Sequence, residues 1–348
     1  MSMLMKNYVD YAVEQMIHLC NIPSPSGFTA KAGQYLCDEL ARLGYQPVLT
    51  NKKAVLVDLG GEGNGLLLAA HIDTLGAMVR GIKPNGRLRL SKIGSFPENY
   101  IETENCTIHT RTGKEYSGTI QIEKSSVHVA SCKTISELKR DDANIELVID
   151  EKVNSREDVK KLEISAGDFV SFDSRTLYTR SGFIKSRHLD DKASSGILIA
   201  LAKYIKEQGI PLKRKVYLMF TTYEEVGHGA SAGIPDGVIE MVSVDMGAVG
   251  DDLETDEFKV SICAKDSKGP YDYDLTNRFI EIAKGQKLNY AVDVYPFYGS
   301  DADAALIAGY DLKHGLIGPG IASSHGYERA HYEGIENTFI LLKEYLGS

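Results

Sequence analysis

The sequence predicts an α/β fold in which helices cover both faces of a mostly parallel sheet, with a small all-β domain inserted into it. Strand-like and helix-like segments alternate at the start of the chain and again after residue 184, as they do in parallel sheets. Residues 65–70 (GLLLAA) form an apolar run, which is typical of a strand buried on both faces. Residues 77–183 instead contain short, β-rich segments of alternating polarity. The predicted domains are therefore 1–76 with 184–348, and an inserted domain of 77–183.

Local sequence signals place the individual elements. Helices are expected at residues 4–20 and 29–43, because the turn-forming residues 23–27 (PSPSG) separate two helix-like stretches and Gly44 provides a C′ glycine after the second. The other expected elements are strands at 54–59 and 65–70, a helix at 155–162 in the insertion, a helix at 193–208, strands at 216–220 and within 237–245, a helix at 275–284, a strand at 290–295 and a helix at 336–346.

Composition excludes several classes of protein. The chain has 348 residues, a formal net charge of −9 and no block of five or six basic residues, which argues against nucleic-acid binding. No apolar run is long enough to span a membrane, and the first 20 residues read as an amphipathic helix and not as a signal peptide. The five cysteines are scattered without Cys-x-x-Cys spacing, as expected of reduced thiols. We therefore expect a cytoplasmic protein.

Polar side chains follow three of the apolar strands. His71 and Asp73 come directly after residues 65–70, Glu224 and Glu225 follow residues 216–220, and Asp245 ends a third strand. Open α/β sheets bind their ligands at this edge. His71 can bind a metal through one ring nitrogen while Asp73 accepts a hydrogen bond from the other. Of the two glutamates, one can bind a metal while the other faces a substrate.

Two further motifs complete the set. Asp190 and Asp191 open the helix expected at 193–208, and His325 lies in a loop near the C-terminus, with His331 as a rival ligand. Each motif alone has an ordinary explanation, such as a helix cap or a solvated loop histidine. Together they supply two histidines and three carboxylates, enough for two cations that share Asp190. Imidazole and carboxylate ligands suit zinc, with cobalt and manganese as alternatives.

This ordered set of motifs resembles the M42 family of aminopeptidases with two co-catalytic metal ions, which includes glutamyl aminopeptidase and the tetrahedral aminopeptidases. The resemblance covers essentially the whole chain. It implies the three-layer α/β/α fold of the zinc exopeptidases, with an inserted β-domain. The residues that it implies are His71, Asp190 and Asp245 for one metal ion, Asp190, Glu225 and His325 for the other, Glu224 as general base with Asp73 beside it, Asp191 as an orienting residue, and a cis Asp190–Asp191 peptide bond.

The resemblance also implies the reaction and the assembly. The expected reaction removes the N-terminal residue from short peptides through a metal-activated water, with Glu224 as the base. The inserted domain is expected to serve dimerisation and substrate access, in a homo-oligomer between a dimer and a dodecamer. Thr74 stands where many members carry Glu, and Lys192 where Arg is usual. The preferred N-terminal residue therefore does not carry over.

The role of Asp301 and the function of the chain each have open alternatives. Asp301 lies in a run that matches a family segment near the active site, so it can bind a basic side chain of the substrate or cap a helix at 302–308. The alternative functions are a deacylase or carboxypeptidase of the same clan with two metal ions, a glycosidase, and a non-catalytic assembly module on this scaffold. No Gly-x-Ser-x-Gly or phosphate-binding loop is present to support serine hydrolase or nucleotide chemistry.

Overall fold

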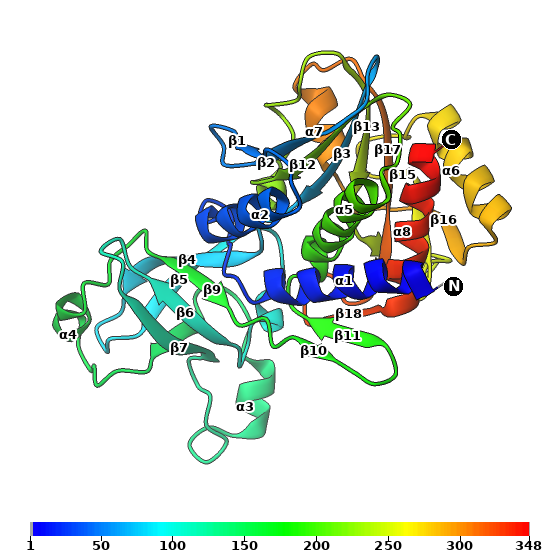
Figure 1. Ribbon diagram of the computed structural model, residues 1–348. Coiled ribbons are helices and arrows are strands. Elements are labelled where there is room, and N and C mark those ends of the chain that lie inside the picture. Colours follow the sequence, from blue (N-terminus) through cyan, green and yellow to red (C-terminus); the bar gives the residue numbers. More distant parts are fainter. Residues whose placement is uncertain (1–2, 348) are drawn as a thin grey trace. The chain divides into compact units, whose positions relative to one another are not determined.

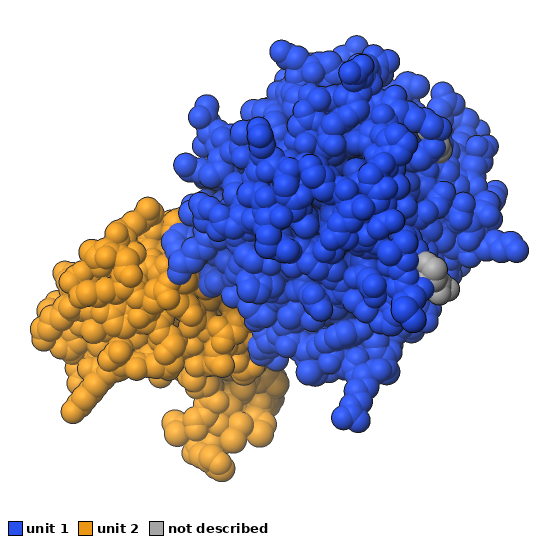
Figure 2. Space-filling model, viewed as in Figure 1, with its two compact units in different colours: residues 1–74, 175–348 blue, residues 75–174 orange. Residues whose placement is uncertain are grey.

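The computed structural model describes residues 3–347 and divides into two compact units (Figure 2). Unit 1 comprises Met1–Thr74 and Arg175–Ser348, and unit 2 comprises Leu75–Ser174. Unit 2 ends earlier than the predicted insertion of 77–183. The reason is that β10 (Leu177–Tyr178) and β11 (Phe183–Ser186) form a three-stranded sheet with β18 (Glu328–His331) of unit 1. Within residues 3–347, no helix is both long and apolar enough to span a bilayer.

A nine-stranded sheet forms the centre of unit 1. The strands in sheet order are β1 (Val48–Leu49), β2 (Val55–Gly60), β12 (Lys215–Thr221), β3 (Gly65–His71), β13 (Val238–Val244), β17 (Lys313–Ile321), β15 (Val260–Lys265) and β16 (Tyr290–Val294), with β14 (Gly247–Ala248) paired to β17. The four central strands β12, β3, β13 and β17 are parallel neighbours, whereas β2 pairs antiparallel to β12 and β15 antiparallel to β17. The carboxyl ends of the central strands therefore share one edge of the sheet.

The side chains of strand β3 contribute to apolar cores on both faces of the sheet of unit 1. Leu66, Leu68 and Ala70 point into a large core, and Leu67 and Ala69 point into a smaller core on the opposite face. Side chains of a strand alternate between faces, so a strand that is buried on both must be apolar throughout. The large core contains residues of α1 (Met3–Cys20), α2 (Ala30–Arg42), α5 (Leu189–Gln208), α6 (Tyr273–Gln286) and α8 (Tyr332–Gly347), and the smaller core contains residues of α7 (Asp301–Ile307) (Figure 1).

The expected helices of unit 1 are all present, but four strands of its nine-stranded sheet, β1, β14, β15 and β17, were not expected. Strand β17 contains Gly315, Gly318, Pro319 and Gly320, a composition that is typical of loops. The structure requires these glycines because neighbouring backbone approaches the strand closely. A Cβ atom at Gly318 would lie 1.8 Å from the carbonyl oxygen of Asp245, and one at Gly320 would lie 2.0 Å from the carbonyl oxygen of Asp256.

Unit 2 is built around a closed β-barrel with its own apolar core. The barrel strands in order are β4 (Gly76–Ile82), β5 (Leu88–Ile93), β8 (Ile145–Ile149), β7 (Glu115–Ile122), β6 (Asn105–His109) and β9 (Phe169–Phe172). Outside the barrel lie η1 (Glu98–Tyr100), α3 (Cys132–Glu137) and α4 (Arg156–Lys161). Helix α4 matches the helix expected at 155–162, whereas α3 was not expected. The β-rich character of the insertion is thus confirmed.

Candidate metal centre

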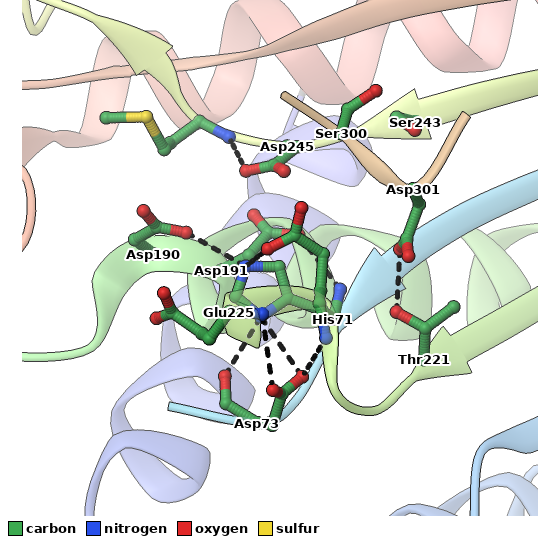
Figure 3. Close-up of polar contacts among 12 residues, drawn as sticks. His71, Asp73, Asp190, Asp191, Thr221, Glu225, Ser243, Asp245, Ser300 and Asp301 are labelled. Carbon is green, nitrogen blue, oxygen red and sulfur yellow. Dashed lines mark hydrogen bonds and ion pairs between the residues drawn. The ribbon is translucent and has the colours of Figure 1, made fainter. Parts of the chain in front are cut away.

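The sheet brings the predicted ligands together at one edge. His71 is the last residue of β3, Asp245 directly follows β13, and Glu224 and Glu225 lie in η2 (Glu224–Val226), just after β12. Because β12 and β13 flank β3 in parallel, these three strand ends are neighbours. Asp190 joins them from the start of α5 (Figure 3).

The first group of ligands is His71, Asp190 and Asp245. One potential ligand atom of each lies within 4.8 Å of the others, and all three residues are buried. Nε2 of His71 is 3.0 Å from Oδ1 of Asp190. This arrangement contains one imidazole and two carboxylates around a common point.

The second group shares Asp190. Nε2 of His325 lies 3.4 Å from Oδ2 of Asp190 and 3.7 Å from Oε2 of Glu225. The two oxygens of Asp190 therefore face two different histidines, as a carboxylate between two cations requires. The rival His331 lies elsewhere, with its Nε2 2.9 Å from the carbonyl oxygen of Ser181.

Asp73 contacts its neighbours differently from the prediction. Nδ1 of His71 is 2.9 Å from the backbone carbonyl oxygen of Asp73 and 3.6 Å from its carboxylate. Asp73 thus accepts the expected hydrogen bond from the ring, but through its main-chain carbonyl oxygen and not through its carboxylate. The carboxylate instead accepts the backbone N–H groups of Glu224 (3.1 Å) and Glu225 (3.4 Å) and the hydroxyl of Ser26. Asp73 thus fixes the loop that carries both glutamates.

The start of α5 is held against β3. The peptide bond between Asp190 and Asp191 is cis, as expected. Oδ2 of Asp191 accepts the backbone N–H of His71 at 3.2 Å, and the hydroxyl of Ser195 donates to the carbonyl oxygen of His71 at 3.1 Å. The next residue, Lys192, is fully buried and donates from Nζ to the carbonyl oxygens of Leu19 (2.9 Å) and Ile22 (2.8 Å). These contacts hold the segment that carries Asp190 against β3 and the end of α1.

Glu328 is a site residue to which the sequence analysis gave no role. Its Oε1 accepts the backbone N–H of His325 at 2.9 Å, and its Oε2 accepts the backbone N–H of Asp190 at 3.2 Å. Its side chain is 1% exposed. The only signal in the sequence is its position three residues after His325, which by itself has no specific meaning.

Asp301 is engaged inside the protein. Its two carboxylate oxygens accept hydrogen bonds from the hydroxyl of Thr221 at 2.6 Å (Figure 3) and from the backbone N–H of Ala230 at 2.8 Å. Helix α7 begins at Asp301, and Ser300 is its N-cap residue, in a capping box with Asp303. The expectation that Asp301 caps the helix is therefore wrong. Its binding of a basic substrate side chain stays a prediction that these contacts do not support.

The electrostatics of the centre follow from burying many acids together. Burial, reinforced by the negative charge of Asp190, raises the pKa of Glu225 to about 8 and that of Asp245 to about 7. Burial also raises the pKa of Glu224 well above its ordinary value. Asp190 is the exception, because hydrogen bonds with His325 and His71 outweigh its burial and lower its pKa. Several of these carboxyl groups would therefore hold protons unless positive charge lies among them.

The hydrogen bonds of His71 test whether a cation fits. A carbonyl oxygen can only accept, so Nδ1 of His71 carries a hydrogen toward Asp73. Nε2 then directs a lone pair at Oδ1 of Asp190, an arrangement that is stable only with a cation or a second proton between them. The donor set of imidazole and carboxylate groups fits zinc, cobalt or manganese. The residues present therefore fit the group of ions that the motifs predicted.

Comparison with solved structures shows the fold. The chain matches a TET aminopeptidase from a marine sediment archaeon, Thaumarchaeota archaeon SCGC AB-539-E09, with a TM-score of 0.86 and 17% identity, covering 97% of this chain and 96% of the other. It matches the Pyrococcus horikoshii TET1 peptidase with a TM-score of 0.83 and 23% identity, covering 96% and 99%. The predicted fold class, a three-layer α/β/α domain with an inserted small all-β domain, is confirmed.

The sequence comparisons define the family. Residues 54–341 match the family model described as M42 glutamyl aminopeptidase, so the chain belongs to the M42 peptidase family and is a hydrolase. It is 44% identical to the YhfE protein of Bacillus subtilis over 97% of both chains. It is also 22% identical to the glutamyl aminopeptidase of Lactococcus lactis over 60% of this chain and 58% of that protein. The predicted family membership is confirmed.

Proposed function

We propose that this chain is a metal-dependent aminopeptidase that removes the N-terminal residue from short peptides with a free N-terminus. The observation that carries the proposal is the position of Asp190, whose two carboxylate oxygens face His71 and His325. A single carboxylate shared by two imidazoles is the expected centre of a site for two divalent cations. Family membership supports the peptidase class, and the ligand geometry supports the metal dependence.

The ligands divide between two cation positions. His71, Asp190 and Asp245 would hold one cation, and Asp190, Glu225 and His325 would hold the other. When bound, two divalent cations supply Lewis acidity that polarises a carbonyl group and lowers the pKa of water. Their positive charge would also compensate the buried carboxylates of Glu225 and Asp245, whose pKa values are raised in its absence. Zinc is our first choice, with cobalt and manganese as alternatives.

Glu224 is the residue that we assign as general base. Its Oε2 lies 3.7 Å from Nε2 of His71, so it borders the first cation position, and the hydrogen bond from its backbone N–H to Asp73 fixes its place. Burial raises the pKa of its carboxyl group well above the ordinary value, which makes its carboxylate a stronger base. Glu224 would accept a proton from the attacking water and pass it to the amine that leaves.

The substrates and the assembly follow from relatives. One relative is named glutamyl aminopeptidase, and one solved structure is titled as a TET1 peptidase that assembles into a tetrahedron or an octahedral shell. From these names we propose that this chain acts on peptides with a free N-terminus and that it forms a homo-oligomer. In that assembly, unit 2 would serve dimerisation and access of substrate. A cytoplasmic location is part of the same proposal.

One experiment tests the proposal as a whole. The purified full chain would be stripped with a chelator and reconstituted separately with zinc, cobalt and manganese, and its metal content measured by mass spectrometry. Each form would then be assayed on peptides with free and with acetylated N-termini. We expect two ions per chain, loss of activity on chelation, and hydrolysis of the free peptides only. Cleavage of the acetylated peptides would favour the deacylase alternative, and activity that survives complete metal removal would overturn metal dependence.

A further inference from the structure

The side chain of Glu328 connects two segments that are far apart in the sequence and that both carry proposed metal ligands. One carboxylate oxygen accepts the backbone N–H of Asp190 and the other accepts the backbone N–H of His325. A hydrogen bond to an ionised carboxylate is stronger than one between neutral groups. Glu328 therefore acts on the positions of both residues through their main chains.

Both of these N–H groups belong to backbone that regular structure does not hold. Asp190 has non-helical dihedral angles (φ −76°, ψ 105°) although it lies within the bounds of α5. His325 has a left-handed φ of 64°, which is uncommon outside glycine and persists only where the surroundings enforce it. Neither residue can rely on a helical or sheet hydrogen bond at this N–H. The carboxylate of Glu328 takes the place of such a partner for both.

Glu328 itself is firmly placed. It is the first residue of β18, which pairs antiparallel to β11 with Ser186 opposite Glu328. Its neighbour Arg329 pairs with Ala322, which precedes the loop that holds His325. The side chain is 1% exposed. The small sheet of β10, β11 and β18 thus fixes the carboxylate, and the carboxylate fixes the ligands.

We propose that Glu328 is a positioning residue that holds Asp190 and His325 at the separation needed to bind the second cation. This inference rests on the proposed function, because it assumes the two cation positions. Glu328 fixes two of the three ligand residues at the second position (Asp190, Glu225 and His325). At the first position (His71, Asp190 and Asp245) it fixes one. Loss of its carboxylate should therefore weaken the second position more than the first.

The test measures metal binding directly. Stripped wild-type protein, Glu328→Gln and Glu328→Ala would be titrated with zinc by equilibrium dialysis, with Glu333→Gln, an exposed glutamate five residues on, as the matched control. We expect two ions per wild-type and control chain. In both Glu328 variants we expect one ion to bind nearly as before, while the Kd of the other rises about 10–100-fold, the usual effect of losing a group that supports a ligand. Glutamine retains a single acceptor oxygen, so the alanine variant should show the larger rise.

Activity measured at increasing zinc separates positioning from a direct role in the reaction. If Glu328 positions ligands, excess zinc should restore most of the kcat of Glu328→Gln, whereas a kcat that stays low with both ions bound would overturn the inference. Equal weakening of both cation positions, or no change in either, would also overturn it. The inference and the proposed function can fail separately. A wild-type protein that binds two ions but does not cleave free peptides would refute the aminopeptidase, while a selective loss of one ion in the Glu328 variants would still support this role.

Discussion

The backbone carbonyl oxygen of Asp73 lies 2.9 Å from Nδ1 of His71, and it is this carbonyl that orients the imidazole ring. The side chain of Asp73 is consequently available for a different contact, the backbone N–H groups of Glu224 and Glu225. One residue therefore sets the direction of a proposed ligand through its main chain and the place of the proposed base through its side chain.

This division leads to a prediction for Asp73→Asn. The substitution keeps the carbonyl group that faces His71, so the protein should still bind two metal ions. An amide nitrogen would now face one of the two backbone N–H groups, which loosens the glutamate loop, and we expect kcat to fall about 10–100-fold. Metal analysis together with steady-state kinetics checks both parts. Loss of a metal ion in this variant would mean that the carboxylate, and not the carbonyl, supports His71.

Glu224→Gln should separate metal binding from catalysis. The amide keeps the size of the side chain but cannot take up a proton at neutral pH, so kcat should fall by about 10²–10⁴-fold while both ions remain bound. Glu14→Gln, a change at an exposed position in α1, is the control and should leave kcat unchanged. Near-normal turnover by Glu224→Gln would remove Glu224 from the mechanism.

Alanine substitutions at His325 and His331 should have different effects. His325→Ala removes a proposed ligand, so one of the two ions should be lost and activity should fall with it. His331→Ala removes a ring that packs against Phe183 and Phe258, so the free energy of unfolding should drop by about 1–3 kcal/mol with both ions retained. Metal content and urea unfolding of the two variants distinguish these outcomes, and retention of both ions by His325→Ala would contradict the assignment.

Gly318→Ala should damage both stability and activity. The added Cβ would lie 1.8 Å from the carbonyl oxygen of Asp245, and backbone must move to accommodate it. We expect a loss of at least about 3 kcal/mol in stability and a displaced Asp245. Gly285→Ala in α6 is the matched control, since outside the adjacent residues and the backbone of its own helix no heavy atom lies within 4 Å of the new Cβ, and it should stabilise the helix by about 0.5–1 kcal/mol. Thermal unfolding and metal content measure the difference, and equal effects of the two substitutions would contradict the role of close packing.

The stability of the chain should depend on pH through Asp303. Burial, together with the nearby carboxyl group of Asp266, raises the pKa of Asp303 to about 7. A carboxyl group whose pKa is raised in the folded state above its ordinary value of 3.8 contributes stability that is complete below about pH 4 and is lost progressively as the pH rises to about 7. Relative to Asp303→Asn, the wild type should therefore lose stability between about pH 4 and pH 7, with little further change above pH 8. Urea midpoints at several pH values, with Asp38→Asn as an exposed control, measure this change. A constant difference across that range would contradict the raised pKa.

The sequence was sufficient to predict an element or a site residue where one local pattern determines its structure. The apolar run that became β3 and the polar residues at the ends of β3, β12 and β13 could be placed because parallel strands bring their carboxyl ends to one edge. It was insufficient where a residue acts through a distant backbone. Strand β17 has the composition of a loop because Gly318 must admit the carbonyl group of Asp245. Glu328 gave no signal because its partners are main-chain N–H groups, which every residue other than proline has.

The first and last strands of the unit 2 barrel lie side by side. Strands β4 and β9, which begin and end the unit, are antiparallel neighbours with Ala77 opposite Val170. An insertion whose two ends lie side by side can be lengthened, exchanged or deleted during evolution without disturbing the order of the strands that precede and follow it. His71 precedes this insertion in the sequence and Asp190 follows it. Natural variation can therefore act on the inserted barrel as a separate module, while the proposed metal ligands in unit 1 stay where its sheet holds them.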